Sequence, residues 1–199
     1  MCQAWERKQP NLYIISYINS MTLASYITLL RIFLIFPVVL LISKHQSYLN
    51  IVALALFVIA AITDYLDGYV ARKTNKESPL GALLDLLADK LLVCITLIWL
   101  TFIFQQIYLT IPVIFIISRE LVISSLRQFV VERIGQNPIN VLPIGKSKTT
   151  LQLISISFLI ISPNLGSFFY SITIILLWIS ALISLYSLIS YSRAYKNFF

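Results

Sequence analysis

The sequence has few charged residues and few of the residues that build metal or disulfide frameworks in small soluble proteins. Charged residues make up 12% of the 199 residues and hydrophobic residues 59%, and the mean hydropathy is +0.88. These values lie far outside the usual range of soluble domains. Cys2 and Cys94 are far apart and His45 is the only histidine, so neither a disulfide framework nor a zinc site is expected. The composition predicts an integral membrane protein.

Long apolar runs recur from about Met21 to the C-terminus, and each is close to the ~20 residues that cross a bilayer as a helix. The sequence therefore predicts an all-α bundle with six transmembrane helices. These are expected at residues 22–43, 49–72, 80–104, 107–133, 146–163 and 167–192. We expect residues 1–20 to form an N-terminal juxtamembrane segment, without a removable signal peptide. Residues 21–199 would form one membrane catalytic domain.

The basic residues lie mainly in the connections on one side of this predicted bundle. They are Arg7, Lys8, Lys73, Lys76, Arg133, Lys146, Lys148, Arg193 and Lys196. The connections on the other side are nearly uncharged, with Lys44 as the exception. The positive-inside rule therefore places both termini in the cytoplasm. Because the basic residues form no stripe with interleaved aromatic residues, nucleic acid is not an expected partner, whereas membrane lipids are.

Four of the eight acidic residues are the aspartates Asp64, Asp67, Asp85 and Asp89, around the junction of the second and third predicted spans. With about 100° of rotation per residue, each helix presents one acidic face edged with small residues. The faces consist of Asp64, Asp67, Gly68 and Ala71 on the second span, and of Gly81, Asp85 and Asp89 on the third. Small residues permit close backbone approach and leave room for a ligand.

Four carboxylates in one place need an explanation, because an ionised aspartate in the middle of a membrane costs about 2.5–3.5 kcal/mol. Carboxylates close together also repel one another. Divalent cations remove both costs, and oxygen ligands without histidine or cysteine favour Mg²⁺, Mn²⁺ or Ca²⁺ over Zn²⁺. The cluster thus predicts a site for one or two metal ions. The alternative is that the aspartates only pair with Arg72, Lys73 and Lys90 at the helix ends.

The spacing of these residues also forms a longer motif. It reads Asp64-x-x-Asp67-Gly68-x-x-Ala71-Arg72 and, after eight residues, Gly81-x-x-x-Asp85-x-x-x-Asp89. This motif resembles the signature of the CDP-alcohol phosphatidyltransferases, and the likeness extends from about Leu23 to the last helix. It implies a six-helix enzyme, with a homodimer as its assembly. In the implied reaction, an alcohol attacks the β-phosphoryl group of a CDP-linked lipid such as CDP-diacylglycerol, and CMP leaves.

The resemblance also implies roles for single residues. Asp64, Asp67 and Asp85 are implied as ligands of a two-metal Mg²⁺ or Mn²⁺ site. Asp89 is implied as the catalytic base and as a further metal ligand. The implied CDP-lipid pocket consists of Thr28, Gly68, Ala71, Arg72 and Gly81, with Arg72 facing phosphate.

Four basic residues further along the chain predict the acceptor site. Arg119 and Arg127 lie about 80° and roughly 12 Å apart on the fourth span. A buried Arg119 needs an anion, which Glu120, a metal-site aspartate or a substrate phosphate could provide. Lys146 and Lys148 begin the fifth span, where free backbone N–H groups favour anions. We therefore expect an acceptor alcohol that carries phosphate, with a purely structural salt bridge of Arg119 as the alternative.

The stretches SREL-x-x-S-x-LR at 118–127 and GK-x-KT at 145–149 resemble one branch of the family. That branch makes phosphatidylglycerol phosphate with sn-glycerol 3-phosphate as acceptor, in a bacterial-type cytoplasmic membrane. Sibling activities stay open, with phosphatidylglycerol (in cardiolipin synthesis), inositol phosphate or serine as acceptor. A cation transporter is an alternative from another class, because acidic residues inside a membrane often mark ion paths. Against transport, the outer halves of the second and third spans are almost wholly apolar.

Overall fold

The computed structural model describes the backbone of residues 23–74, 79–134 and 143–195, and the side chains of residues 28–63, 84, 86–130 and 148–193. Within these ranges the chain forms six helices and no strand. The helices are α2 (Leu23–Ile42), α3 (Ser47–Thr74), α4 (Pro79–Phe104), α5 (Ile107–Ile134), α6 (Pro143–Leu165) and α7 (Ser167–Tyr195). The all-α fold with six helices is confirmed. Pro37 and Pro112 lie inside α2 and α5, which membrane helices tolerate.

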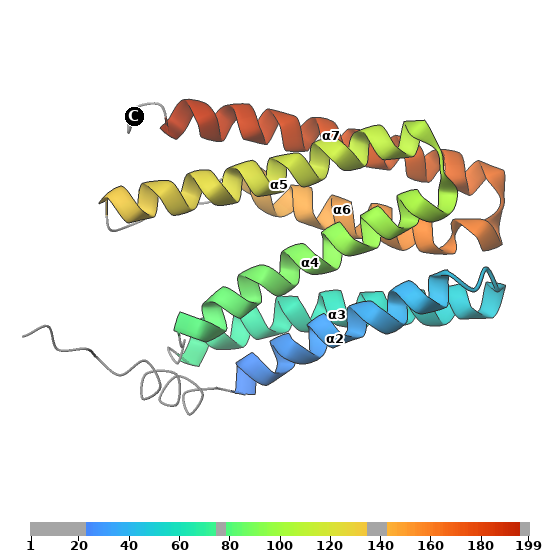
Figure 1. The fold of residues 1–199 in the computed structure, drawn as a ribbon, viewed down its shortest axis with the longest axis horizontal. Coiled ribbons are helices and arrows are strands. Elements are labelled where there is room, and N and C mark those ends of the chain that lie inside the picture. Colours follow the sequence, from blue (N-terminus) through green and yellow to red (C-terminus); the bar gives the residue numbers. More distant parts are fainter. Residues whose placement is uncertain (1–22, 75–78, 135–142, 196–199) are drawn as a thin grey trace, which may run out of the picture.

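The helices pack as two groups of three. In the first group α2 packs against both α3 and α4, and in the second group α7 packs against both α5 and α6. The groups meet where α3 contacts α6 and where α4 contacts α5 and α6. Figure 1 shows α2 and α3 in its lower part and α5, α6 and α7 in its upper part, with α4 running obliquely between them. The junction between the groups therefore runs through the middle of the molecule.

Three very short connections join the helices at one end of the bundle, which we call the connection end. They are residues 43–46, residues 105–106 and Gly166. His45, Gln105 and Gly166 have positive φ angles of 51°, 50° and 89°, the left-handed conformation that commonly ends a helix. Gly166 adopts it without a steric penalty, and its N–H donates to the Ser162 carbonyl over 3.2 Å. The opposite end, where α3 finishes and α4 begins, is called the aspartate end.

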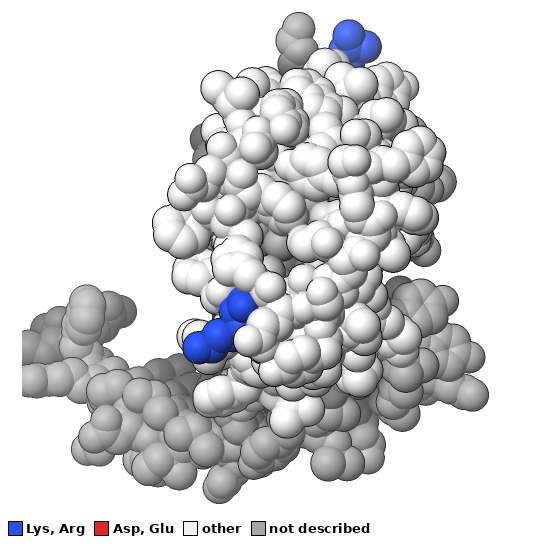
Figure 2. All heavy atoms as spheres, turned by 90° about the vertical axis from the view of Figure 1, so that its right-hand side faces the viewer, with Lys and Arg blue, Asp and Glu red and all other residues white. Residues whose placement is uncertain are grey.

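Asparagines join the two groups at the connection end. The buried Asn50 of α3 donates through Nδ2 to Oδ1 of Asn164 in α6 over 3.1 Å. Asn164 donates in turn through its own Nδ2 to the Ser47 carbonyl over 2.7 Å. Figure 2 shows this end of the molecule, where the described atoms are mostly uncharged, with a few blue basic groups and no red acidic ones.

The core contains a fully buried apolar side chain from every described helix. These are Val38, Phe57, Leu97, Ile116, Leu159 and Leu177, in chain order from α2 to α7. Large apolar side chains also cover the outside, such as Phe33 and Phe36 of α2, which are 70% and 65% exposed. Such a surface suits lipid. Since lipid tails are as apolar as leucine, close packing rather than exclusion from water holds the core together.

Membrane-spanning segments occur in the described residues. Leu86–Phe104, Ile107–Val130 and Ser167–Arg193 are each long and apolar enough to cross a membrane, and Thr28–Ile42 and Ser47–Thr63 are shorter apolar stretches. Together with the apolar exterior, they identify a multi-pass membrane protein.

Truncating the core should destabilise the bundle. We expect Phe57→Ala to lower the free energy of unfolding in detergent by about 3–5 kcal/mol, because the cavity removes packing contacts on all sides. Phe36→Ala is the matched control, since its ring is 65% exposed, and it should unfold like the parent protein. Thermal unfolding of both variants checks this, and equal melting temperatures would contradict the packing described above.

Candidate active site

The four aspartates lie on the two helices that bound the aspartate end. Asp64 and Asp67 are in the C-terminal part of α3, and Asp85 and Asp89 are in the N-terminal part of α4. Of the four, only the side chain of Asp89 is described. The side chains of Asp64, Asp67, Gly68, Ala71, Arg72, Gly81 and Asp85 lie outside the described residues. Among the side chains that are described, no group of three or more histidines, cysteines, aspartates or glutamates occurs. The metal ligands stay a prediction.

Asp89 lies at the junction between the two helix groups. Its half-buried side chain lines a small cavity between α4, α5 and α6. The lining residues are Asp89, Lys90, Val93 and Cys94 of α4, Glu120 of α5, and Thr149 and Gln152 of α6. The cavity volume is about 20 Å³, which is room for about one water molecule. The expected catalytic base therefore shares a cavity with the acidic residue of the SREL stretch.

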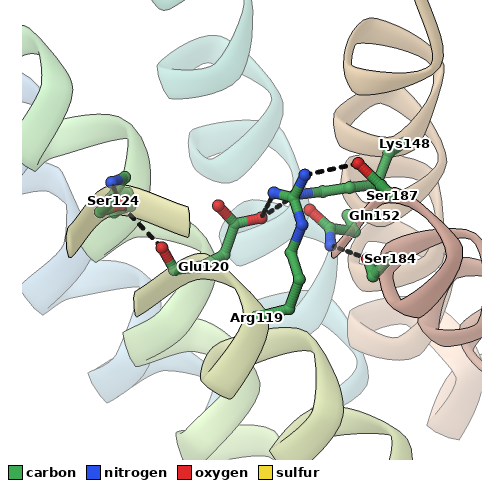
Figure 3. A network of polar contacts seen from close by, with 8 residues as sticks. Arg119, Glu120, Ser124, Lys148, Gln152, Ser184 and Ser187 are labelled. Carbon is green, nitrogen blue, oxygen red and sulfur yellow. Dashed lines mark hydrogen bonds and ion pairs between the residues drawn. The ribbon is translucent and has the colours of Figure 1, made fainter. Parts of the chain in front are cut away.

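Glu120 is the centre of a polar network that joins α5, α6 and α7 (Figure 3). Its Oε1 accepts from NH1 of Arg119 over 3.2 Å and also from Nζ of Lys148. NH2 of Arg119 donates to Oγ of Ser187 in α7 over 2.7 Å. One turn away, Nε2 of Gln152 donates to Oγ of Ser184 over 3.3 Å. We call these residues, together with Lys90 and Ser124, the Glu120 network.

The two cations that contact the Glu120 carboxylate are buried. The exposed fraction is 5% for Arg119 and 1% for Lys148. Burying a charge without a partner is very costly, so the Glu120 carboxylate stabilises both cations in this position. The Nε of Arg119 is also buried, and no hydrogen-bond partner is found for it among the described residues. The Nε–H group of Arg119 is therefore available to donate a hydrogen bond to a further acceptor.

Lys90 connects the network to the other helix group. Its Nζ donates to Oγ of Ser124 in α5. The Ser124 hydroxyl donates to the Glu120 carbonyl over 2.7 Å, a bond to the residue four positions earlier that serine commonly makes in helices. Lys90 and Glu120 thus reach the same cavity from opposite sides of the junction.

The structure brings together two of the four predicted acceptor residues, Arg119 and Lys148. Arg127 is half-buried and takes no part in the Glu120 network, although its Nε is buried and has no partner among the described residues. The side chain of Lys146 lies outside the described residues. In the expected CDP-lipid pocket, Thr28 is described and is 2% exposed.

Several residues of the network were not predicted. Gln152, Ser184 and Ser187 are polar residues in apolar spans, a signal that the sequence does contain. However, α7 has many serines, so the sequence alone does not distinguish Ser184 and Ser187 from the others. The pairing of Glu120 with Arg119 was one of the options considered from the sequence, and this contact is present.

Comparison with known proteins agrees with the motif. The profile of the CDP-alcohol phosphatidyltransferase domain matches residues 21–186. A Salmonella choleraesuis (strain SC-B67) protein named CDP-diacylglycerol–glycerol-3-phosphate 3-phosphatidyltransferase is 34% identical over 171 residues, which is 86% of this chain and 93% of the relative. An Escherichia coli (strain K12) protein of the same name is 34% identical over 168 residues, or 84% of this chain and 91% of that relative.

Proposed function

This chain belongs to the CDP-alcohol phosphatidyltransferase family, and from that premise we propose that it makes phosphatidylglycerol phosphate. Its substrates are CDP-diacylglycerol and sn-glycerol 3-phosphate, as the names of its relatives indicate for those proteins. The observation that carries the choice of acceptor is the meeting of two buried cations, Arg119 and Lys148, beside the cavity that Asp89 lines. Two cations at one point suit a phosphate group with up to two negative charges, whereas serine offers only one carboxylate and free glycerol offers no anion.

In the proposed reaction, the Asp89 carboxylate takes the proton of the attacking hydroxyl group. The hydroxyl oxygen forms a new bond to the β-phosphorus of CDP-diacylglycerol. The bond from this phosphorus to the bridging oxygen breaks, and CMP leaves with the electron pair. A positioned general base of this kind contributes about 10²–10⁴-fold to the rate. Arg119 and Lys148 would hold the acceptor by its phosphate, so that its hydroxyl group faces Asp89.

Asp64, Asp67, Asp85 and Asp89 would hold one or two Mg²⁺ or Mn²⁺ ions, because their donor set consists of carboxylate oxygens alone. A bound divalent ion supplies charge neutralisation for a pyrophosphate. The aspartates on α3 and α4 would hold the divalent ions at the aspartate end. Thr28, Gly68, Ala71, Arg72 and Gly81 would line the CDP-lipid pocket, where Arg72 contacts phosphate.

We place the aspartate end on the cytoplasmic side of the membrane. The connections at that end carry most of the basic residues, whereas the connection end has Lys44 alone between its helices. The soluble substrate sn-glycerol 3-phosphate and the soluble product CMP would then exchange with the cytoplasm. As the family resemblance implies, we propose a homodimer.

An assay of CMP release with different acceptors tests this function. We expect purified protein with CDP-diacylglycerol and Mg²⁺ or Mn²⁺ to release CMP with sn-glycerol 3-phosphate, at a kcat/KM about 100-fold or more above that with glycerol. A chelator should abolish the release, and added Mn²⁺ should restore it.

Serine, inositol phosphate and phosphatidylglycerol are the comparison acceptors in the same assay. CMP release with one of them but not with sn-glycerol 3-phosphate would reassign the acceptor. Metal uptake into protein-containing vesicles, without turnover of CDP-diacylglycerol, would instead favour the transporter.

A further inference from the structure

The anion that joins Arg119 and Lys148 comes from the protein itself. Both cations contact one oxygen, Oε1 of Glu120, and both are almost completely buried. We propose that the Glu120 carboxylate occupies the place of the acceptor's phosphate and is displaced when the acceptor binds. This inference rests on the proposed function, because it assigns the role of a competitor to a residue of the acceptor site.

The space around the network supports displacement rather than simple addition of a phosphate. Of the described charged residues, Asp89, Lys90 and Glu120 line the cavity, whereas Arg119 and Lys148 are not among its lining residues. A ligand in this cavity therefore meets the Glu120 carboxylate before it meets the two cations. The volume of about 20 Å³ admits about one water molecule. A phosphate from this cavity can contact Arg119 and Lys148 only after the carboxylate has moved.

The network also offers the displaced carboxylate another cation. Lys90 lines the same cavity as Glu120, and its Nζ contacts Ser124, whose hydroxyl group bonds to the backbone carbonyl of Glu120. Glutamate has three rotatable side-chain bonds, so its carboxylate can turn without movement of α5. When it turns toward Lys90, it uncovers the donors of Arg119 and Lys148 for the phosphate.

Competition of this kind would select the acceptor. A carboxylate carries one negative charge and two oxygens, whereas a phosphate monoester carries up to two charges and three terminal oxygens. A phosphate monoester can therefore replace Glu120 between two cations, but an uncharged alcohol cannot. The Glu120 carboxylate would thus exclude acceptors that lack a phosphate. This effect adds to the attraction between the two cations and the phosphate of the correct acceptor. In the absence of acceptor, the same carboxylate prevents two buried cations from facing each other unpaired.

Replacing Glu120 by glutamine tests the inference on the full-length protein in detergent. Glutamine has nearly the same shape but no charge, so it can no longer compete with an anion. We expect Glu120→Gln to bind inorganic phosphate and sn-glycerol 3-phosphate about tenfold more tightly than the parent protein. The KM for sn-glycerol 3-phosphate should fall by a similar factor, while glycerol binding stays unchanged. Without ligand the variant should melt at a lower temperature, and phosphate should restore most of the loss.

Ser187→Ala is the matched control, because it removes a neutral partner of Arg119 and leaves the carboxylate in place. It should show no gain in phosphate affinity. If Glu120→Gln does not fold, Glu120→Asp provides the same test, since a shorter carboxylate competes less well and should tighten phosphate binding by about threefold.

Two failures are distinguishable in these experiments. If the parent protein releases CMP with sn-glycerol 3-phosphate but neither Glu120 variant gains phosphate affinity, the displacement is wrong and Glu120 only positions the two cations. If the parent protein releases no CMP with sn-glycerol 3-phosphate, the proposed function fails, and the inference fails with it.

Discussion

Replacing Asp89 by asparagine is expected to reduce phosphatidyl transfer by about 10²–10⁴-fold, because the amide cannot accept the proton of the acceptor hydroxyl group. The two side chains have nearly the same size, so the fold and the cavity between α4, α5 and α6 should be kept. CMP release in a single turnover with saturating substrates measures the loss directly. Calorimetry with Mn²⁺ should show that Asp89→Asn retains most of its metal binding.

Two control variants separate the role of the base from other effects. Cys94→Ala changes a neutral residue on the same helix and the same cavity, and it should keep nearly full activity. Asp64→Asn should weaken metal binding and turnover together, because Asp64 is expected to be a metal ligand and not a base. Undiminished activity of Asp89→Asn would remove this residue as the base.

Replacing Arg119 by alanine should have the second largest effect. Arg119 is 5% exposed, and the loss of a buried cation that contacts the acceptor's phosphate typically costs about 2–4 kcal/mol. We therefore expect the KM for sn-glycerol 3-phosphate to rise about 30- to 1,000-fold. The KM for CDP-diacylglycerol should change little. Initial rates with each substrate varied in turn give both values.

Arg193→Ala is the control for this prediction, since Arg193 is an exposed arginine in the last turn of α7. Its kinetics should match those of the parent protein. If Arg119→Ala lowers the melting temperature but leaves the acceptor KM unchanged, Arg119 forms only a structural salt bridge with Glu120. That alternative was open from the sequence.

Much of the fold could be predicted because hydrophobic runs of membrane length define helices directly. The six predicted spans match the six helices to within a few residues at most ends. The largest differences are three residues, at the start of α6, which begins at Pro143 rather than residue 146, and at the end of α7, which ends at Tyr195 rather than residue 192. Proline suits the first position of a helix, because the N–H that it lacks would have no partner there. An average of hydropathy does not detect this local geometry.

The site was harder to predict, because its contacts join residues far apart in the chain. Glu120 and Lys148 are 28 positions apart, and Arg119 and Ser187 are 68 apart. The basic residues could be recognised as an acceptor site from their charge in an apolar span. Which of them meet depends on how α5, α6 and α7 pack, and no local pattern contains that information. The sequence grouped Arg119, Arg127, Lys146 and Lys148, and of these Arg119 and Lys148 meet at Glu120 while Arg127 does not join them.

The Asn50–Asn164 bond and the short connection at residues 105–106 join the two helix groups at the connection end. One motion that would keep these contacts is a tilt of one helix group about the connection end. Because a helix rises 1.5 Å per residue, a tilt of about 5° over 28 residues shifts the far tip by about 3–4 Å. Such a swing would leave the asparagine pair nearly still and would be largest where α4 begins (Figure 1). A tilt about the connection end would therefore change the spacing between the two helix groups most at the aspartate end.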